Sequence, residues 1–183
     1  MARQPLTLLD ACTVVNLYAT RWMAQILAAT GESFAVADVV ERESQFVLRG
    51  GSGAGATARE PIDLQPLLDD RILEVVSAEE EDELLTFIDL SQEVDEREAM
   101  TAALAIHRGC IVVTDDRKAT RVLLARGVNL HTSLDLIRVW SEIPAVTKAI
   151  LRLALTDLRQ RGHYDPPRGH ALRGWWDEAI NAP

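Results

Sequence analysis

The fold of this protein is decided by the stretch Cys110-Ile111-Val112-Val113-Thr114-Asp115-Asp116-Arg117. The uncharged run from Cys110 to Thr114 is typical of a parallel strand that is buried on both faces. Two aspartates end this run, and apolar residues at helical spacing follow over 117–126. The stretch therefore predicts a strand, a turn and a helix, with two carboxylates at the carboxyl end of the strand.

The same order of elements recurs on both sides of this stretch. Short apolar runs predict strands at 6–9, 33–36, 72–76 and 129–131. Helical spacing predicts helices at 16–29, 38–48, 78–90, 94–108, 133–141 and 145–161, with one further short helix in 163–183. Because strands and helices alternate, we predict an α/β fold in three layers, with a central parallel sheet flanked by helices.

The composition limits the class of protein. A chain of 183 residues that is 48% hydrophobic can bury an ordinary core, which excludes a disordered chain and a fibrous repeat. The formal charge of −9 argues against a protein that coats nucleic acid through bulk electrostatics. Cys12 and Cys110 follow no signal segment, and no apolar run is long enough to span a membrane. We therefore expect a cytoplasmic protein with no membrane segment.

Several familiar motifs are absent or misplaced. The glycine-rich stretch 50–58 formally satisfies a dinucleotide fingerprint, but it follows a predicted helix and leads towards proline, so it predicts a flexible loop. No Gly-Lys pair is present for a phosphate-binding P-loop, and the four histidines have no cysteine partners at zinc spacing.

Four acidic residues remain as candidates for chemistry. Asp10 ends the first apolar run and Asp116 follows the strongest one, and in an open parallel sheet ligands bind outside the carboxyl ends of the strands. Glu98 lies one helical turn before Ala102 on a face of small residues, and Glu43 follows apolar positions of another predicted helix. The alternatives are a helix cap for either aspartate and a solvated surface charge for either glutamate.

The order of these pieces resembles that of the PIN-domain ribonucleases, which include the toxin components of bacterial toxin–antitoxin pairs. The resemblance covers roughly residues 6–137 and implies a PIN-like three-layer fold. It rests on four pieces, which are Leu8-Leu9-Asp10, Val36 to Glu43, Glu96-Arg97-Glu98-Ala99 and Thr114-Asp115-Asp116-Arg117-Lys118-Ala119.

The resemblance also implies a set of site residues. The catalytic acids would be Asp10, Glu43, Glu98 and Asp116. The metal ligands would be Asp10, Glu98 and Asp116, with Asp115 in place of Asp116 if the register shifts by one residue. Thr114 matches a hydroxyl position just before the last acid, and substrate contacts are predicted for Thr13, Asn16, Thr114 and Arg117. Glu98 stands where toxin members more often have aspartate, and Cys12 stands where serine is common.

The implied function is that of a metal-dependent endoribonuclease. Mg²⁺ or Mn²⁺ suits a site of carboxylates, because hard cations take oxygen ligands. RNA phosphodiesters would be hydrolysed by in-line attack of a metal-activated water, which leaves 5′-phosphate and 3′-hydroxyl ends. The expected partners are single-stranded or structured RNA, an antitoxin protein and further copies of the chain in a homo-oligomer. The alternative is a non-catalytic PIN-like scaffold that binds RNA or protein.

We expect a single catalytic domain over 1–143, with a C-terminal helical extension and tail over 144–183. Residues 144–176 carry six basic and two acidic side chains, or 6 − 2 = +4, in an otherwise acidic chain. This basic segment could contact RNA phosphates, pair with an acidic partner surface or simply be solvated. Trp175 and Trp176 are expected to be packing residues rather than base-stacking ones.

Overall fold

The structure is a computed structural model, and it describes residues 6–42, 45–50 and 58–181. Two compact units are present, and each is assembled from three segments of the chain. The unit that we call the sheet unit comprises Met1–Val14, Gly31–Ser44 and Asp63–Ser133. The helical unit comprises Val15–Thr30, Gln45–Ile62 and Leu134–Pro183, so the extension expected from residue 144 is one part of it.

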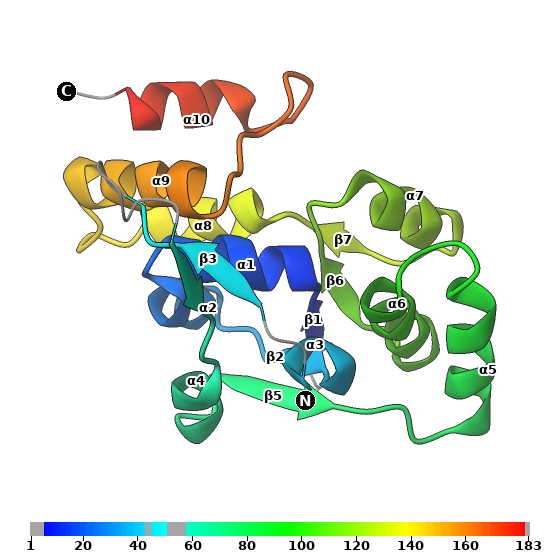
Figure 1. Ribbon diagram of the computed structural model, residues 1–183. Coiled ribbons are helices and arrows are strands. Elements are labelled where there is room, and N and C mark those ends of the chain that lie inside the picture. The colour runs from blue at the N-terminus through cyan, green and yellow to red at the C-terminus, as the bar shows by residue number, and fades with distance from the viewer. Residues whose placement is uncertain (1–5, 43–44, 51–57, 182–183) are drawn as a thin grey trace. The chain divides into compact units, whose positions relative to one another are not determined.

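The sheet unit contains a five-stranded parallel sheet with the strand order β5-β2-β1-β6-β7 (Figure 1). The strands are β1 (Thr7–Leu9), β2 (Phe34–Ala37), β5 (Leu73–Val76), β6 (Ile111–Val113) and β7 (Leu130–His131). The central strands are the most apolar, and Leu8, Leu9, Val112 and Val113 are fully buried. The predicted α/β class and each of the five predicted parallel strands are therefore confirmed.

The strand order marks one position as special. From β1 the chain continues to β2 and β5 on one side, and it then returns to β6 and β7 on the other side. The connections therefore diverge between β1 and β6, whose carboxyl ends lie side by side. Crevices at such a switch point are where open α/β sheets bind their ligands.

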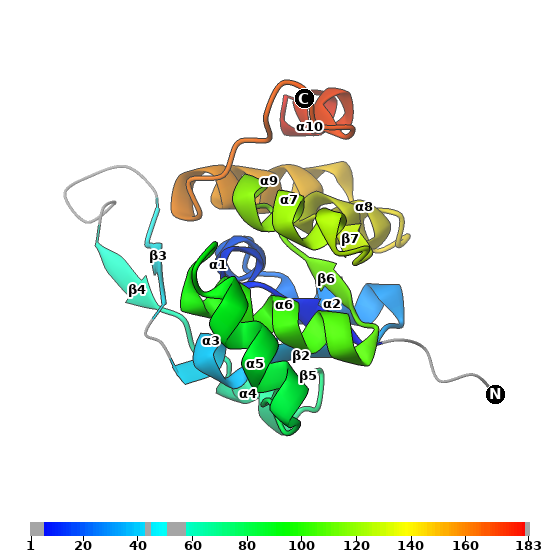
Figure 2. The same ribbon diagram turned by 90° about the vertical axis from the view of Figure 1, so that its right-hand side faces the viewer.

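Five helices belong entirely to the sheet unit. They are α3 (Asp38–Arg42), α4 (Gln65–Asp69), α5 (Glu81–Leu90), α6 (Glu96–Arg108) and α7 (Arg117–Ala125). Helix α6 is buried from Ala99 to Ala105, and its small side chains allow close packing against the neighbouring elements. Helix α5 lies beside it, as Figure 2 shows. The N-cap of α6 is Asp95, and its C-cap is Gly109 in the left-handed conformation.

The helical unit is built from helices and one β-hairpin. Its complete helices are α2 (Met23–Thr30), α9 (Lys148–Arg161) and α10 (Arg173–Ile180). It also contains most of α1 (Ala11–Ala19) and of α8 (Ser133–Ser141). Strands β3 (Phe46–Leu48) and β4 (Arg59–Pro61) form the antiparallel hairpin. No helix in the described part of the chain is long and apolar enough to span a membrane.

Two of the predicted helices are wrong in their extent. The helix predicted over 16–29 is divided into α1 and α2, because Arg21 between them has a positive φ of 68°. The Thr20 hydroxyl donates to Leu17 O and accepts from the Trp22 N–H, which stabilises this turn. The helix predicted over 38–48 ends at Arg42, since Phe46–Leu48 pairs with β4 instead.

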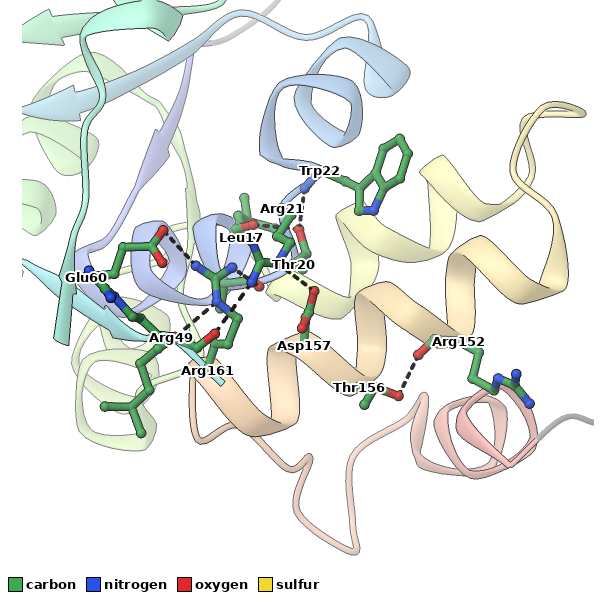
Figure 3. Close-up of polar contacts among 12 residues, drawn as sticks. Leu17, Thr20, Arg21, Trp22, Arg49, Glu60, Arg152, Thr156, Asp157 and Arg161 are labelled. Carbon is green, nitrogen blue, oxygen red and sulfur yellow. Dashed lines mark hydrogen bonds and ion pairs between the residues drawn. The ribbon is translucent and has the colours of Figure 1, made fainter. Parts of the chain in front are cut away.

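A buried arginine joins three elements of the helical unit (Figure 3). Arg161, near the end of α9, has a side chain that is 1% exposed. Its guanidinium donates to Leu48 O at 3.0 Å, to Ala19 O at 2.9 Å and to Glu60 Oε1 at 2.9 Å. The guanidinium thereby ties the end of β3, the end of α1 and β4 to α9.

At least three of the six basic side chains in segment 144–176 are paired in the structure. Arg161 is buried against Glu60, and both Arg159 and Arg173 are paired with Asp165. The +4 count therefore overstates the charge that this segment offers to a phosphate backbone. Trp176 is fully buried and packs edge-on against Tyr164, which confirms its predicted packing role.

Candidate functional site

The carboxyl ends of β1 and β6 are joined through the carboxylate of Asp10. This residue follows β1 directly and is only 2% exposed. Its Oδ1 accepts the Ala11 N–H at 2.7 Å, and its Oδ2 accepts the Thr114 hydroxyl at 2.8 Å. Because Thr114 follows β6, the side chain of Asp10 is held in one orientation between the two strands.

Cys12 and Thr114 extend this hydrogen-bond network. The Cys12 thiol donates to Asp10 Oδ2 at 3.4 Å, and its sulfur accepts the Asp115 N–H at 3.4 Å. The Thr114 Oγ1 also accepts the Asp116 N–H at 3.2 Å. Burial and the charges of Asp10 and Asp115 raise the pKa of the Cys12 thiol to about 12, so the thiol stays protonated and acts as a donor.

The two adjacent aspartates after β6 have different surroundings. Asp116 is the N-cap of α7, and its Oδ1 accepts the N–H groups of Lys118 and Ala119 at 2.7 and 2.8 Å. Asp115 accepts the Ser133 N–H at 3.2 Å and also the Ser133 hydroxyl. The charge of Asp116 acts on Glu98, whereas the side chain of Asp115 is engaged by Ser133. The choice between the two registers that the sequence left open stays a prediction.

Glu98 reaches this site from the first turn of α6. Burial and the negative charges of Asp95, Asp10 and Asp116, in that order, raise the pKa of Glu98 to about 7. The neighbouring Asp95 accepts the N–H groups of Arg97 and Glu98, both at 3.0 Å. The N-cap therefore fixes the backbone of the turn that carries Glu98.

Asp95 is a site residue that the sequence reading missed. Its charge contributes to the raised pKa of both Asp10 and Glu98. An aspartate directly before a helix is a common N-cap signal. Because the helix was predicted to begin at Val94, Asp95 was placed inside the helix and was not considered as its N-cap. The charges of Asp10, Asp95 and Asp116 thus all act on Glu98, and the charge of Asp95 also acts on Asp10.

Negative charge and burial act together on Asp10 and Glu98. Burial, together with the charge of Asp95, raises the pKa of Asp10, although hydrogen bonds from Thr114 and Ala11 oppose that rise. Arg97 pairs with Asp95 at 3.2 Å, and no other basic side chain in the described residues pairs with these four acids. Among the described residues, no group of three or more His, Cys, Asp or Glu side chains forms a ready metal site.

The other predicted site residues lie in varied positions. Thr13 is buried, and its hydroxyl donates to Val113 O at 2.8 Å, which anchors the start of α1 to β6. Arg117 is exposed in the first turn of α7, directly after Asp116. Asn16 belongs to the helical unit, and Glu43 lies outside the described residues. Hydrogen bonds thus join Asp10, Thr114 and Asp116, and the charges of Asp10 and Asp116 act on Glu98.

Comparisons with protein-family models, with curated proteins and with solved structures find no match to this chain.

The raised pKa of Glu98 predicts how stability depends on pH. The folded protein holds the Glu98 proton up to about pH 7, whereas the carboxyl group ordinarily loses it near 4.5. The free energy of unfolding should therefore fall as the pH rises through this window. Glu98→Gln should reduce this fall, and Glu96→Gln, an exposed change in the same helical turn, should not. Urea unfolding at about pH 5 and about pH 8 measures the difference, and equal slopes for the two variants would contradict it.

Proposed function

We propose that this protein is a metal-dependent endoribonuclease of the PIN type. One observation carries the proposal: Asp10, Glu98 and Asp116 come from three different elements and interact electrostatically at the switch point of a parallel sheet. Burial and the charges of Asp95, Asp10 and Asp116 raise the pKa of Glu98, and groups perturbed in this way are frequent at functional sites. The resemblance of the strand-end and helix motifs to PIN-domain ribonucleases supplies the substrate class.

The donor set suits Mg²⁺ or Mn²⁺. Carboxylate oxygens are the ligands that these cations prefer, and Asp10, Glu98 and Asp116 would hold the ion. A cation bound there would lower the pKa of water and would offset charge on the scissile phosphate. The neighbouring groups keep the acids in place, since Thr114 and Ala11 orient Asp10 and the first amides of α7 orient Asp116.

The remaining protein groups support binding of an RNA strand. Arg117 is exposed next to Asp116 and is the nearest basic residue along the chain for a phosphate group. We further propose that a toxin role would bring an antitoxin partner, that copies of the chain form a homo-oligomer, and that the protein acts in the cytoplasm.

A second candidate function is that of a non-catalytic scaffold that binds RNA or protein. The structural roles of Asp10 and Asp116 favour this second function. Asp116 caps α7, and Asp10 joins β1 to β6 through Thr114. Both aspartates would therefore stabilise the fold even without catalysis.

Metal binding is the first test of the proposal. We expect millimolar Mn²⁺ to raise the melting temperature, because a cation relieves the repulsion among Asp10, Glu98 and Asp116. The rise should be larger at about pH 8 than at about pH 5, since the carboxylates must lose their protons before they bind. Calorimetric titration should show binding that Asp116→Asn weakens. An unchanged melting temperature and no heat of binding would refute the metal site.

Activity is the second test. A single-stranded RNA with a fluorescent label should be cleaved in Mn²⁺ or Mg²⁺ and left intact in EDTA. Before the assay, the protein should be unfolded, freed of bound partners and refolded, because a neutralising partner would mask the activity. If metal binds but no RNA is cleaved, the scaffold becomes the better proposal.

A further inference from the structure

Helix α5 presents an apolar face outward from the sheet unit. Leu84, Leu85 and Ile88 are 45%, 56% and 58% exposed, and at positions i, i+1 and i+4 they share one side of the helix. Large apolar side chains that are grouped and exposed in this way commonly mark an interaction site.

An ion pair on the opposite side of α5 fixes the orientation of this helix. Glu83 is 2% exposed, and Arg108 of α6 donates to its two carboxylate oxygens at 2.6 and 2.9 Å. Hydrogen bonds from Arg108 hold the pKa of Glu83 at about 2, so the ion pair persists at all working pH values. Because this pair and the capping box hold α5 against α6, the apolar side chains cannot simply turn inward.

The surroundings of this apolar face are strongly acidic. Between Arg71 and Arg97 the sequence contains ten acidic residues and no lysine, arginine or histidine. Glu81, Asp82 and Asp89 are exposed on α5 next to the apolar side chains, and they form no ion pair with any residue that the structure describes. Glu83 and Glu93 are already paired with Arg108 and Arg126. The face therefore combines an apolar centre with an unpaired acidic rim.

We propose that this α5 face, defined by Leu84, Leu85 and Ile88 and rimmed by Glu81, Asp82 and Asp89, docks a basic amphipathic helix of a partner protein. The apolar stripe of such a helix buries the three exposed side chains, and lysines or arginines beside the stripe pair with the acidic rim. A second copy of the chain suits the face poorly, because a symmetric contact would set one acidic rim against the other. This inference does not depend on the proposed nuclease activity.

A designed peptide tests the surface directly. The probe is an 18-residue labelled peptide of leucine, lysine and alanine with its leucines on one helical face, and the control peptide has the same composition with the leucines spread around the helix. Fluorescence anisotropy against the full chain measures binding. The first peptide should bind, and Leu85→Ser with Ile88→Ser should weaken it by at least about tenfold. Leu124→Ser is the matched control, because Leu124 is an equally exposed leucine in α7 of the same unit.

Variants that remove negative charge from α5 provide a second test of the docking surface. Asp82→Asn with Asp89→Asn should weaken binding several-fold at low salt, and the difference should shrink at high salt. Asp63→Asn, an exposed change outside α5, should leave binding unchanged. Equal binding of the two peptides, or equal binding by the wild type and the Leu85/Ile88 variant, would overturn the proposal. A dimer in solution that the Leu85/Ile88 variant converts to a monomer would also overturn it, since a second copy would then be the occupant.

Discussion

Asp10→Asn is expected to lower the rate of metal-dependent RNA cleavage by more than about a hundredfold, because under the proposed function it removes an ionic ligand and not merely a supporting group. The fold should survive the change. An asparagine oxygen can still accept the Ala11 N–H, and the Thr114 hydroxyl can accept from the new amide. Since burial already disfavours a charge at Asp10, the melting temperature of the variant should be no lower than that of the wild type.

Two matched aspartate-to-asparagine changes control this experiment. Asp63 is exposed, and its side chain accepts only a local N–H from Gln65, so Asp63→Asn should cleave like the wild type. Asp115→Asn tests the register after β6, and because Asp115 is engaged by Ser133, it should retain far more activity than Asp116→Asn. Equal activity of Asp10→Asn and the wild type would remove Asp10 from the site.

Arg161→Leu is expected to have the largest effect on stability. The change leaves the carbonyl groups of Leu48 and Ala19 without their hydrogen-bond donor. It also removes the ion-pair partner of Glu60. Leaving a buried acceptor without its donor costs about 1–3 kcal/mol, so the two carbonyl groups together cost about 2–6 kcal/mol, whereas the side chain of Glu60 is 34% exposed and can be solvated. We therefore expect a loss of this size in the free energy of unfolding, measured by urea titration with tryptophan fluorescence.

The control for Arg161 lies one half-turn earlier in the same helix. Arg159 pairs with Asp165, but its side chain is 44% exposed, and Arg159→Leu should cost no more than about 1 kcal/mol. Glu60→Gln should be intermediate, because a glutamine oxygen can still accept from Arg161. If Arg161→Leu cost no more than Arg159→Leu, the buried guanidinium would not be a main support of the helical unit.

The sheet and two of its acids were predictable because their signals are local. Each strand is a short apolar run, and Asp10 and Asp116 directly follow such runs, so the parallel topology alone brings them to one edge. Glu98 was predictable because a carboxylate among small residues on a buried helix is unusual. The effect of Asp10 and Asp116 on the pKa of Glu98 follows from the strand order, which no single segment contains.

Features that depend on distant partners were not predictable. Phe46–Leu48 has helical spacing in the sequence, and only its pairing with Arg59–Pro61 makes it a strand. Arg161 was counted as part of a basic segment, because nothing in α9 indicates that carbonyl groups from α1 and β3 surround it. The helix over 78–90 was predicted, but the side of α5 that faces outward depends on the ion pair between Glu83 and Arg108 of α6.

The end groups of the RNA fragments test the proposed function most directly. In Mn²⁺, the wild type should leave 5′-phosphate and 3′-hydroxyl ends, which is the outcome of hydrolysis by an activated water. These fragments should be absent in EDTA and absent with Asp10→Asn at the same protein concentration. Fragments with 2′,3′-cyclic phosphate ends, cleavage that persists in EDTA, or equal cleavage by Asp10→Asn would contradict a metal-dependent nuclease site at the ends of β1 and β6.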